Sequence, residues 1–170
     1  MILARASLIS SLSATRTLFS VLPPTDAWLR FWQKRLDALD CQGLADGELA
    51  EVITAQGVDR LPDSLTSFLR IAGRSCGRLW LGSDSYYPRF LTLKESALSL
   101  AKEMGVDIPA FKEEAVVSLM HQGYVFLYLQ SDGDDPPVMQ FHEGYAEPEQ
   151  IADSFSSFVE SSLANIRSAD

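Results

Sequence analysis

The stretch LPDSLTSFLRIAG, residues 61–73, combines helical periodicity with signals for both ends of a helix. Its apolar side chains recur at intervals of three and four residues and form one stripe: Leu65, Phe68, Leu69 and Ala72. Pro62 suits the first helical turn, where its missing N–H costs nothing, and Gly73 suits the position just past the helix end. The polar face carries only hydroxyl side chains and Arg70. We therefore predict a short helix packed on a core, with little material for catalysis.

Two helices are predicted before this one. After a Pro-Pro pair, apolar side chains repeat at helical spacing and are expected in the core: Trp28, Trp32, Leu36 and Leu39. A second helix is predicted to follow Asp46 and to stop at Gly57. Its apolar face consists of Leu49, Val52 and Ile53.

Two more helices are predicted in the second half of the chain. One covers residues 93–104, where Thr92 and Glu95 match the T-x-x-E capping box that starts many helices. The other closes the chain, with one side formed by Ile151, Phe155, Phe158, Ser162 and Ile166.

Between these helices the period changes to that of strands. Runs rich in strand-forming residues are RLWLG (78–82), AVVSL (115–119), YVFLYLQ (124–130) and VMQFH (138–142). Gly123 permits a tight turn, so the second and third runs predict an antiparallel hairpin. The third run is apolar on both faces, which favours a central strand covered by helices. SDSYYPRF is predicted to be a loop with two exposed tyrosines, and EGYAEPE a turn.

This order of elements predicts the α+β class, with a central, mostly antiparallel sheet flanked by helices. We expect one domain over residues 26–170 and find no internal repeat. Residues 1–25 contain no acidic residue, two arginines and five serines, and are predicted to be a leader or a flexible tail.

The net charge of −9 is concentrated in one part of the chain. Residues 95–170 carry three basic and fourteen acidic side chains. Nucleic acid is an unsuitable partner for such a surface, because phosphate contacts require clustered Lys and Arg. A basic protein partner fits better, although an acidic surface can also serve solubility alone.

The cysteine content and the hydropathy predict a soluble, cytoplasmic protein. Cys41 and Cys76 form no C-x-x-C pair and are interpreted as reduced thiols. No apolar run approaches the roughly 18 residues that a membrane helix needs.

The most specific enzymatic pattern is GRSCG, residues 73–77, which matches the G-x-S-x-G nucleophile elbow around Ser75. The chain order allows a triad with Asp132 or Asp134 and then His142. An elbow needs a strand before the serine and a helix after it, and here the predicted order is reversed. A glycine-rich turn from helix to strand is the competing interpretation.

Other ligand motifs are incomplete. His121 and His142 have no metal-ligand spacing to the cysteines, and His121 is predicted to bond backbone groups of the hairpin turn. SDGDDPP lacks the length and the terminal Glu of an EF-hand, so it is interpreted as a solvated acidic loop. Neither phosphate-binding nor dinucleotide-binding glycine motifs occur. We expect no cofactor.

Three stretches resemble the SUKH superfamily, specifically the Smi/Knr-type immunity proteins. They are EVITAQGVDRLPDSLTSFLRIAG, HQGYVFLYL followed by DDPPV and an aromatic strand, and DSFSSFV, and together they span about residues 45–163. The resemblance implies an α+β domain without catalytic residues. For many bacterial members it implies neutralisation of a toxin, and for others an intracellular scaffold that binds proteins.

We hypothesise that the acidic half of the chain binds a basic toxin domain, such as a nuclease, and blocks its active site. The residues expected to steer the partner are Asp132, Asp134, Asp135, Glu143, Glu147 and Glu149. Tyr86, Tyr87 and Tyr145 are expected to be anchors, because tyrosine is enriched at binding hot spots. A protein-interaction scaffold is the alternative, and a small hydrolase using Ser75 is a remote one.

Overall fold

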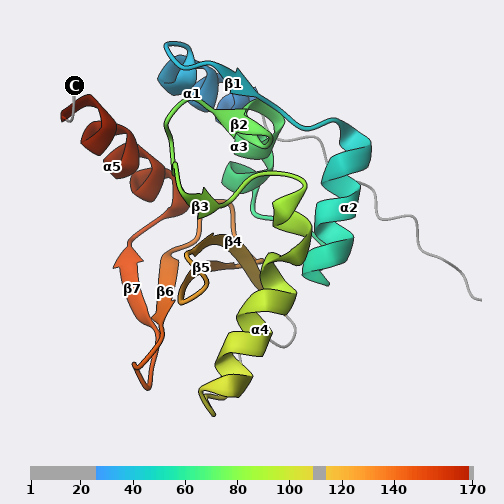
Figure 1. Cartoon of the computed structure of the whole chain (residues 1–170). Helices are drawn as coiled ribbons and strands as arrows, with labels where there is room; N and C mark the ends of the chain where they lie inside the picture. Colours follow the sequence, from blue (N-terminus) through green and yellow to red (C-terminus); the bar gives the residue numbers. More distant parts are fainter. Residues whose placement is uncertain (1–25, 109–113, 169–170) are drawn as a thin grey trace, which may run out of the picture.

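The computed structural model describes residues 26–108 and 114–168 (Figure 1). Its helices are α1 (Asp26–Leu36), α2 (Asp46–Gln56), α3 (Asp63–Ala72), the 3-10 helix η1 (Arg89–Thr92), α4 (Leu93–Glu103) and α5 (Phe155–Ser168). Its strands are β1 (Cys41–Gln42), β2 (Ser75–Cys76), β3 (Ser83–Asp84), β4 (Ala115–His121), β5 (Val125–Gln130), β6 (Val138–His142) and β7 (Glu149–Ala152). The predicted α+β class is confirmed. The segment 1–25, predicted to be a leader or tail, lies outside the described residues.

The main sheet has five antiparallel strands in the order β3-β4-β5-β6-β7, so β5 is its central strand. The predicted hairpin is confirmed, with Leu119 of β4 opposite Leu127 of β5. Residues 115–120 and 126–129 are all buried, which requires cover on both faces of these strands. Part of that cover comes from α4, which packs against β4 (Figure 1).

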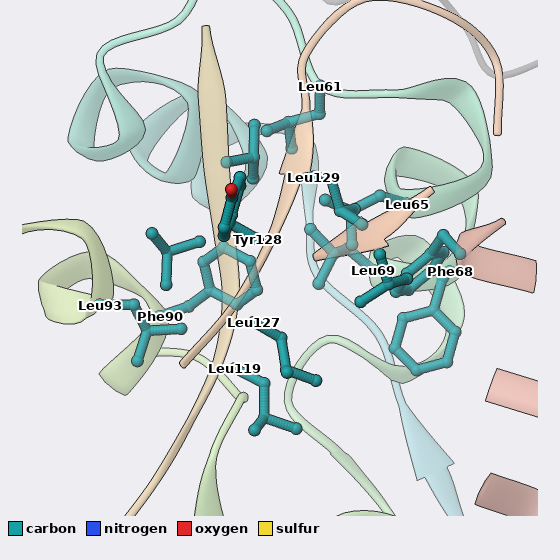
Figure 2. Close-up of a cluster of buried hydrophobic side chains, with 14 of the residues drawn as sticks. Leu61, Leu65, Phe68, Leu69, Phe90, Leu93, Leu119, Leu127, Tyr128 and Leu129 are labelled. Atoms are coloured by element: carbon teal, nitrogen blue, oxygen red, sulfur yellow. The ribbon is translucent and has the colours of Figure 1, made fainter. Parts of the chain in front are cut away.

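Alternate side chains of β5 enter two apolar layers (Figure 2). Leu129 lies beside Leu65 of α3, whereas the ring of Tyr128 lies next to the ring of Phe90 from η1. This is the two-faced burial that the apolar run predicts for a central strand.

An aromatic cluster joins α1 to the rest of the core. Trp32 is fully buried, and the centre of its ring lies 5.4 Å from that of Phe68 and 6.0 Å from that of Phe155. Its Nε1 donates a hydrogen bond to the backbone oxygen of Ser64 at 2.8 Å, so the buried indole N–H is satisfied. Trp32 is therefore a core residue as predicted, and Trp28 is half-buried at the edge of the cluster.

A side chain takes the place of a strand along part of β4. β3 pairs only with Met120 and His121. Beyond them, the fully buried amide of Gln56 accepts a hydrogen bond from the Val117 N–H at 2.9 Å and donates one to the Val117 oxygen at 3.2 Å. Lys94 then donates to the Gln56 backbone oxygen at 2.5 Å, and burial lowers the pKa of its ammonium group. The end of α2 is thereby fixed to the sheet.

Several local predictions are wrong. RLWLG is a turn rather than a strand, with Trp80 in the left-handed region at φ 53°. Ile151 belongs to the edge strand β7, so the last helix begins later than the pattern indicates. Thr92 makes no capping bond to α4 and instead donates to the Arg89 oxygen within η1.

The hydroxyl-bearing face of α3 is not a solvent face. Ser64, Thr66 and Ser67 are all buried, because α1 packs against this helix. The helix is therefore enclosed on sides that the sequence pattern assigns to solvent.

Cys41 and Cys76 are bonded to each other, so the prediction of two reduced thiols is wrong. They are partners across the β1–β2 ladder, with Cα atoms 3.9 Å apart, and lie 35 residues apart in the chain. Disulfides persist mainly in oxidising compartments. The cytoplasmic location therefore stays a prediction.

Candidate protein-binding surface

Two turns lie side by side at one end of the main sheet. One joins β4 to β5 and the other joins β6 to β7. Val125 pairs with His142, and the Glu143 N–H donates to the Tyr124 oxygen at 2.8 Å, so the second turn is held against the first. We call this region, residues 121–124 and 142–148, the turn end of the sheet.

The turn end carries a row of four rings: His121, Tyr124, His142 and Tyr145. The distances between successive ring centres are 6.2, 5.7 and 5.2 Å, and each ring is steeply inclined to the next. Edge-to-face contacts of this kind are favourable and hold the rings in place. Tyr145 is 62% exposed, which makes it one of the most exposed large apolar side chains among the described residues. An exposed tyrosine on a fixed neighbour suits a binding anchor.

Carboxylates accompany the rings. Glu143, Glu147 and Glu149 are all exposed. Glu149 accepts a hydrogen bond from the Gln140 amide at 3.3 Å. Glu143 and Glu147 therefore lie with Tyr145 at the turn end, and Glu149 lies next to it at the start of β7.

The three predicted aspartates lie at the opposite end of the sheet, in the loop between β5 and β6. β5 has six residues, which separates the two ends by about 20 Å. The nine predicted residues therefore do not form one surface.

Two of these aspartates help to hold the fold. Asp135 accepts hydrogen bonds from the N–H of Ser156 at 3.0 Å and from its hydroxyl at 2.5 Å, and so stabilises the start of α5. The backbone oxygen of Asp134 accepts from the Ser64 N–H at 2.8 Å, at the start of α3. The prediction of a fully solvated acidic loop is wrong for Asp135, while the side chains of Asp132 and Asp134 are exposed.

Tyr86 and Tyr87 are half-buried rather than exposed, contrary to the prediction. The Tyr86 hydroxyl donates to the Leu79 oxygen at 2.7 Å, and burial raises its pKa. The Tyr87 hydroxyl donates to the Glu51 carboxylate at 2.7 Å. This bond is the largest cause of the raised pKa of Tyr87, and burial and the Glu51 charge act in the same direction. Both hydroxyls are used within the fold.

Ser75 does not have the geometry of a nucleophile elbow. It lies within β2, paired with Gln42 in the small sheet, and the preceding element is the helix α3. His142, its predicted partner, lies on β6 of the other sheet and belongs to the ring row. The helix before Ser75 is present as predicted, but the strand expected after it at 78–82 is a turn, and Ser75 itself lies in a strand.

The imidazole of His121 bonds a side chain rather than the turn backbone, which corrects the prediction. Its Nδ1 lies 2.9 Å from the Ser83 hydroxyl on β3. Within residues 26–108 and 114–168, no three His, Cys, Asp or Glu side chains gather as a metal site. No helix in the same residues is long and apolar enough to cross a membrane.

The ring row was missed, although the sequence contains a signal for it. The tetrapeptide His-x-Gly-Tyr occurs twice, as HQGY at 121–124 and as HEGY at 142–145. The chain therefore does contain a short repeat, and both copies form the turns of one sheet end.

With the fold and this surface described, the chain can be placed in a family. Residues 43–161 match the SMI1 / KNR4 family (SUKH-1), and the protein belongs to that family. No curated protein sequence matches the chain. The family match starts after α1, yet Trp32 of that helix is fully buried in the common core.

Proposed function

We propose that this protein is a non-enzymatic immunity protein that binds a basic toxin domain, such as a nuclease, in the cytoplasm and neutralises it. Membership of the SUKH-1 family supports a protein-binding role. The observation that carries the proposal is the exposed Tyr145 among the exposed carboxylates of Glu143, Glu147 and Glu149.

Charge and rings have separate parts in this proposal. The exposed carboxylates attract a basic partner and raise the association rate from about 10⁵–10⁶ M⁻¹s⁻¹ towards 10⁸ M⁻¹s⁻¹ at low salt. Exposed charges add little affinity, because salt screens them. The tyrosine supplies affinity by burying its ring against the partner. Inhibition then follows from occupation of the surface that the toxin uses for its substrate.

The test is co-expression with the C-terminal domain encoded by the neighbouring gene, in cells that this domain kills. We expect survival only when the immunity chain is present, and co-purification of the pair with an affinity that falls as salt rises. A toxic domain that kills regardless of this chain, without forming a complex, would contradict the proposal. A harmless neighbour, with a host protein bound instead, would support the scaffold alternative.

A charge-matched comparison keeps this test specific. The double variant Glu143→Gln/Glu147→Gln removes two exposed carboxylates from the turn end. Asp132→Asn/Asp134→Asn removes the same charge from the opposite end. We expect only the first variant to slow association and to weaken its salt dependence.

A further inference from the structure

The two His-x-Gly-Tyr turns share one hydrogen bond and one glycine conformation, although only the first has a second positive φ, 51° at Gln122. In each, the Tyr N–H donates to the His oxygen three residues earlier, at 3.3 Å for Tyr124 and 3.1 Å for Tyr145. In each, the glycine has a positive φ, 83° at Gly123 and 90° at Gly144, a conformation that other residues adopt at a cost. The short turns therefore bring each tyrosine ring back against the histidine that precedes it.

The sheet register joins the two pairs into one row. His142 is the partner of Val125, so the second histidine lies beside the tyrosine of the first turn, with ring centres 5.7 Å apart. The His121 end is fixed to Ser83 of β3. The other end, Tyr145, is open to solvent. The row is thus rigid at one end and accessible at the other.

The hydrogen bond of His142 decides which chemistry this accessible end offers. Its Nδ1 lies 2.6 Å from the Glu143 backbone oxygen. A carbonyl oxygen can only accept, so Nδ1 must carry the hydrogen. In the neutral ring Nε2 is then an acceptor, and no hydrogen-bond partner for it is present among the described residues.

The charged side chains two residues before and two residues after Tyr145, in the same turn, are also acceptors. Glu143 and Glu147 are exposed, and neither is in an ion pair within the described part of the chain. The accessible end therefore combines an open tyrosine ring, an imidazole acceptor and two carboxylates. This set matches a flat cation with several N–H donors.

We propose that the open end of the ring row binds an arginine side chain of a basic protein partner. The guanidinium stacks on Tyr145, and its N–H groups donate to Nε2 of His142 and to the carboxylates. Arginine fits better than lysine, because its planar donors can stack and form hydrogen bonds at the same time. The chain uses the same contact internally, where the Arg35 guanidinium lies over the Phe31 ring, 3.4 Å from its centre. This inference rests on the proposed function and names the group that the partner presents.

The experiment is an NMR titration of the full chain with an acetylated, amidated peptide of alternating glycine and arginine. We expect ring-proton shifts at His142 and Tyr145 that saturate with added peptide. A peptide with citrulline in place of arginine keeps the shape but loses the charge, and should bind at least about tenfold more weakly. The lysine peptide should fall between the two.

Two variants at position 145 distinguish the contribution of the aromatic ring to binding from a general loss of structure. Tyr145→Phe keeps the stacking surface and should retain most of the affinity. Tyr145→Ala removes it and should lose about tenfold. Because the residue is exposed, both variants are expected to fold, and unchanged shifts elsewhere in the spectrum check this.

Shifts that map to the 131–135 loop, or equal binding of the arginine and citrulline peptides, would overturn the inference. It would also fail if Tyr145→Ala bound as well as the unmodified chain. These failures are distinct from failure of the proposed function, which is scored by cell survival. A chain that neutralises its toxin but gives no arginine-dependent shifts keeps the function and loses this recognition mode.

Discussion

The two ends of the central sheet use acidic side chains in opposite ways. At the β5–β6 end, Asp135 bonds Ser156 at the start of α5, and Asp134 holds the start of α3 through its backbone. At the turn end, Glu143 and Glu147 are exposed beside a row of rings. The Asp135 side chain therefore contributes to folding, although those of Asp132 and Asp134 are exposed, whereas the two glutamates are free to meet a partner. Equal charge in the sequence therefore does not mean equal function.

The largest expected effect is a loss of stability, without a loss of partner binding, when the Cys41–Cys76 disulfide is removed. The double variant Cys41→Ser/Cys76→Ser opens a loop whose ends are 35 residues apart, and should lower the free energy of unfolding by about 4 kcal/mol in the chain-entropy account. Denaturant unfolding measures this loss, and partner binding below the unfolding transition should be unchanged. If the folded variant instead lost partner binding, the binding surface would depend on the disulfide, and stability and binding would not be separate.

The next effect belongs to the turn end. Tyr145→Ala should weaken partner binding by about 2 kcal/mol, which is about 30-fold, because hot-spot tyrosines have values of this size. Calorimetric titration with the toxin domain measures the change. The free energy of unfolding should shift by less than about 0.5 kcal/mol, as is usual for an exposed position. A large stability loss with unchanged affinity would reverse the assignment of roles.

The matching change at the opposite end should have the reverse outcome. Asp135→Ala removes the acceptor at the start of α5 and should lower the free energy of unfolding by about 1 kcal/mol, with a range of about 0.5–2 kcal/mol. Partner affinity should stay within twofold. If Asp135→Ala instead reduced binding as much as Tyr145→Ala, the partner would have to contact both ends.

The smallest effect compares the chain with and without the hydroxyl of the half-buried Tyr86. Burial raises the pKa of Tyr86, so the unfolded chain loses this proton first as the pH rises. The contribution of the protonated Tyr86 to the free energy of unfolding is fully present below about pH 10 and is lost as the pH rises further. Tyr86→Phe should therefore make stability less sensitive to pH above 10 than in the unmodified chain, as denaturant unfolding at a series of pH values measures. The lowered pKa of Lys94 acts in the opposite direction, but it is common to both chains and cancels.

Much of the fold could be predicted because strong periodicity reflects burial. The stripes of α2 and α3 and the apolar run of β5 are long enough to define their elements. RLWLG misled because Leu79 and Trp80 pack from a turn, whereas Leu81 is exposed. Trp80 stacks on Phe158, and its Nε1 donates to the Ser162 hydroxyl at 3.1 Å. Local propensity does not report such tertiary contacts.

The binding surface was less predictable, for a related reason. Which carboxylates are free depends on the partners that the fold brings to them, and Ser156 is 21 residues from Asp135. The tyrosines show the same effect, since Tyr87 meets Glu51 only after folding. The repeated His-x-Gly-Tyr turn could have been found in the sequence, but its meaning depends on the register that aligns the two copies.

The most direct test of the central claim measures the affinity of the toxin domain for two charge-matched variants. Glu143→Gln/Glu147→Gln and Asp132→Asn/Asp134→Asn each remove two exposed negative charges, at opposite ends of the sheet. We predict weaker, less salt-dependent binding for the first pair and unchanged binding for the second. Equal losses for both pairs, or a loss confined to the aspartates, would contradict the assignment of the turn end as the binding surface.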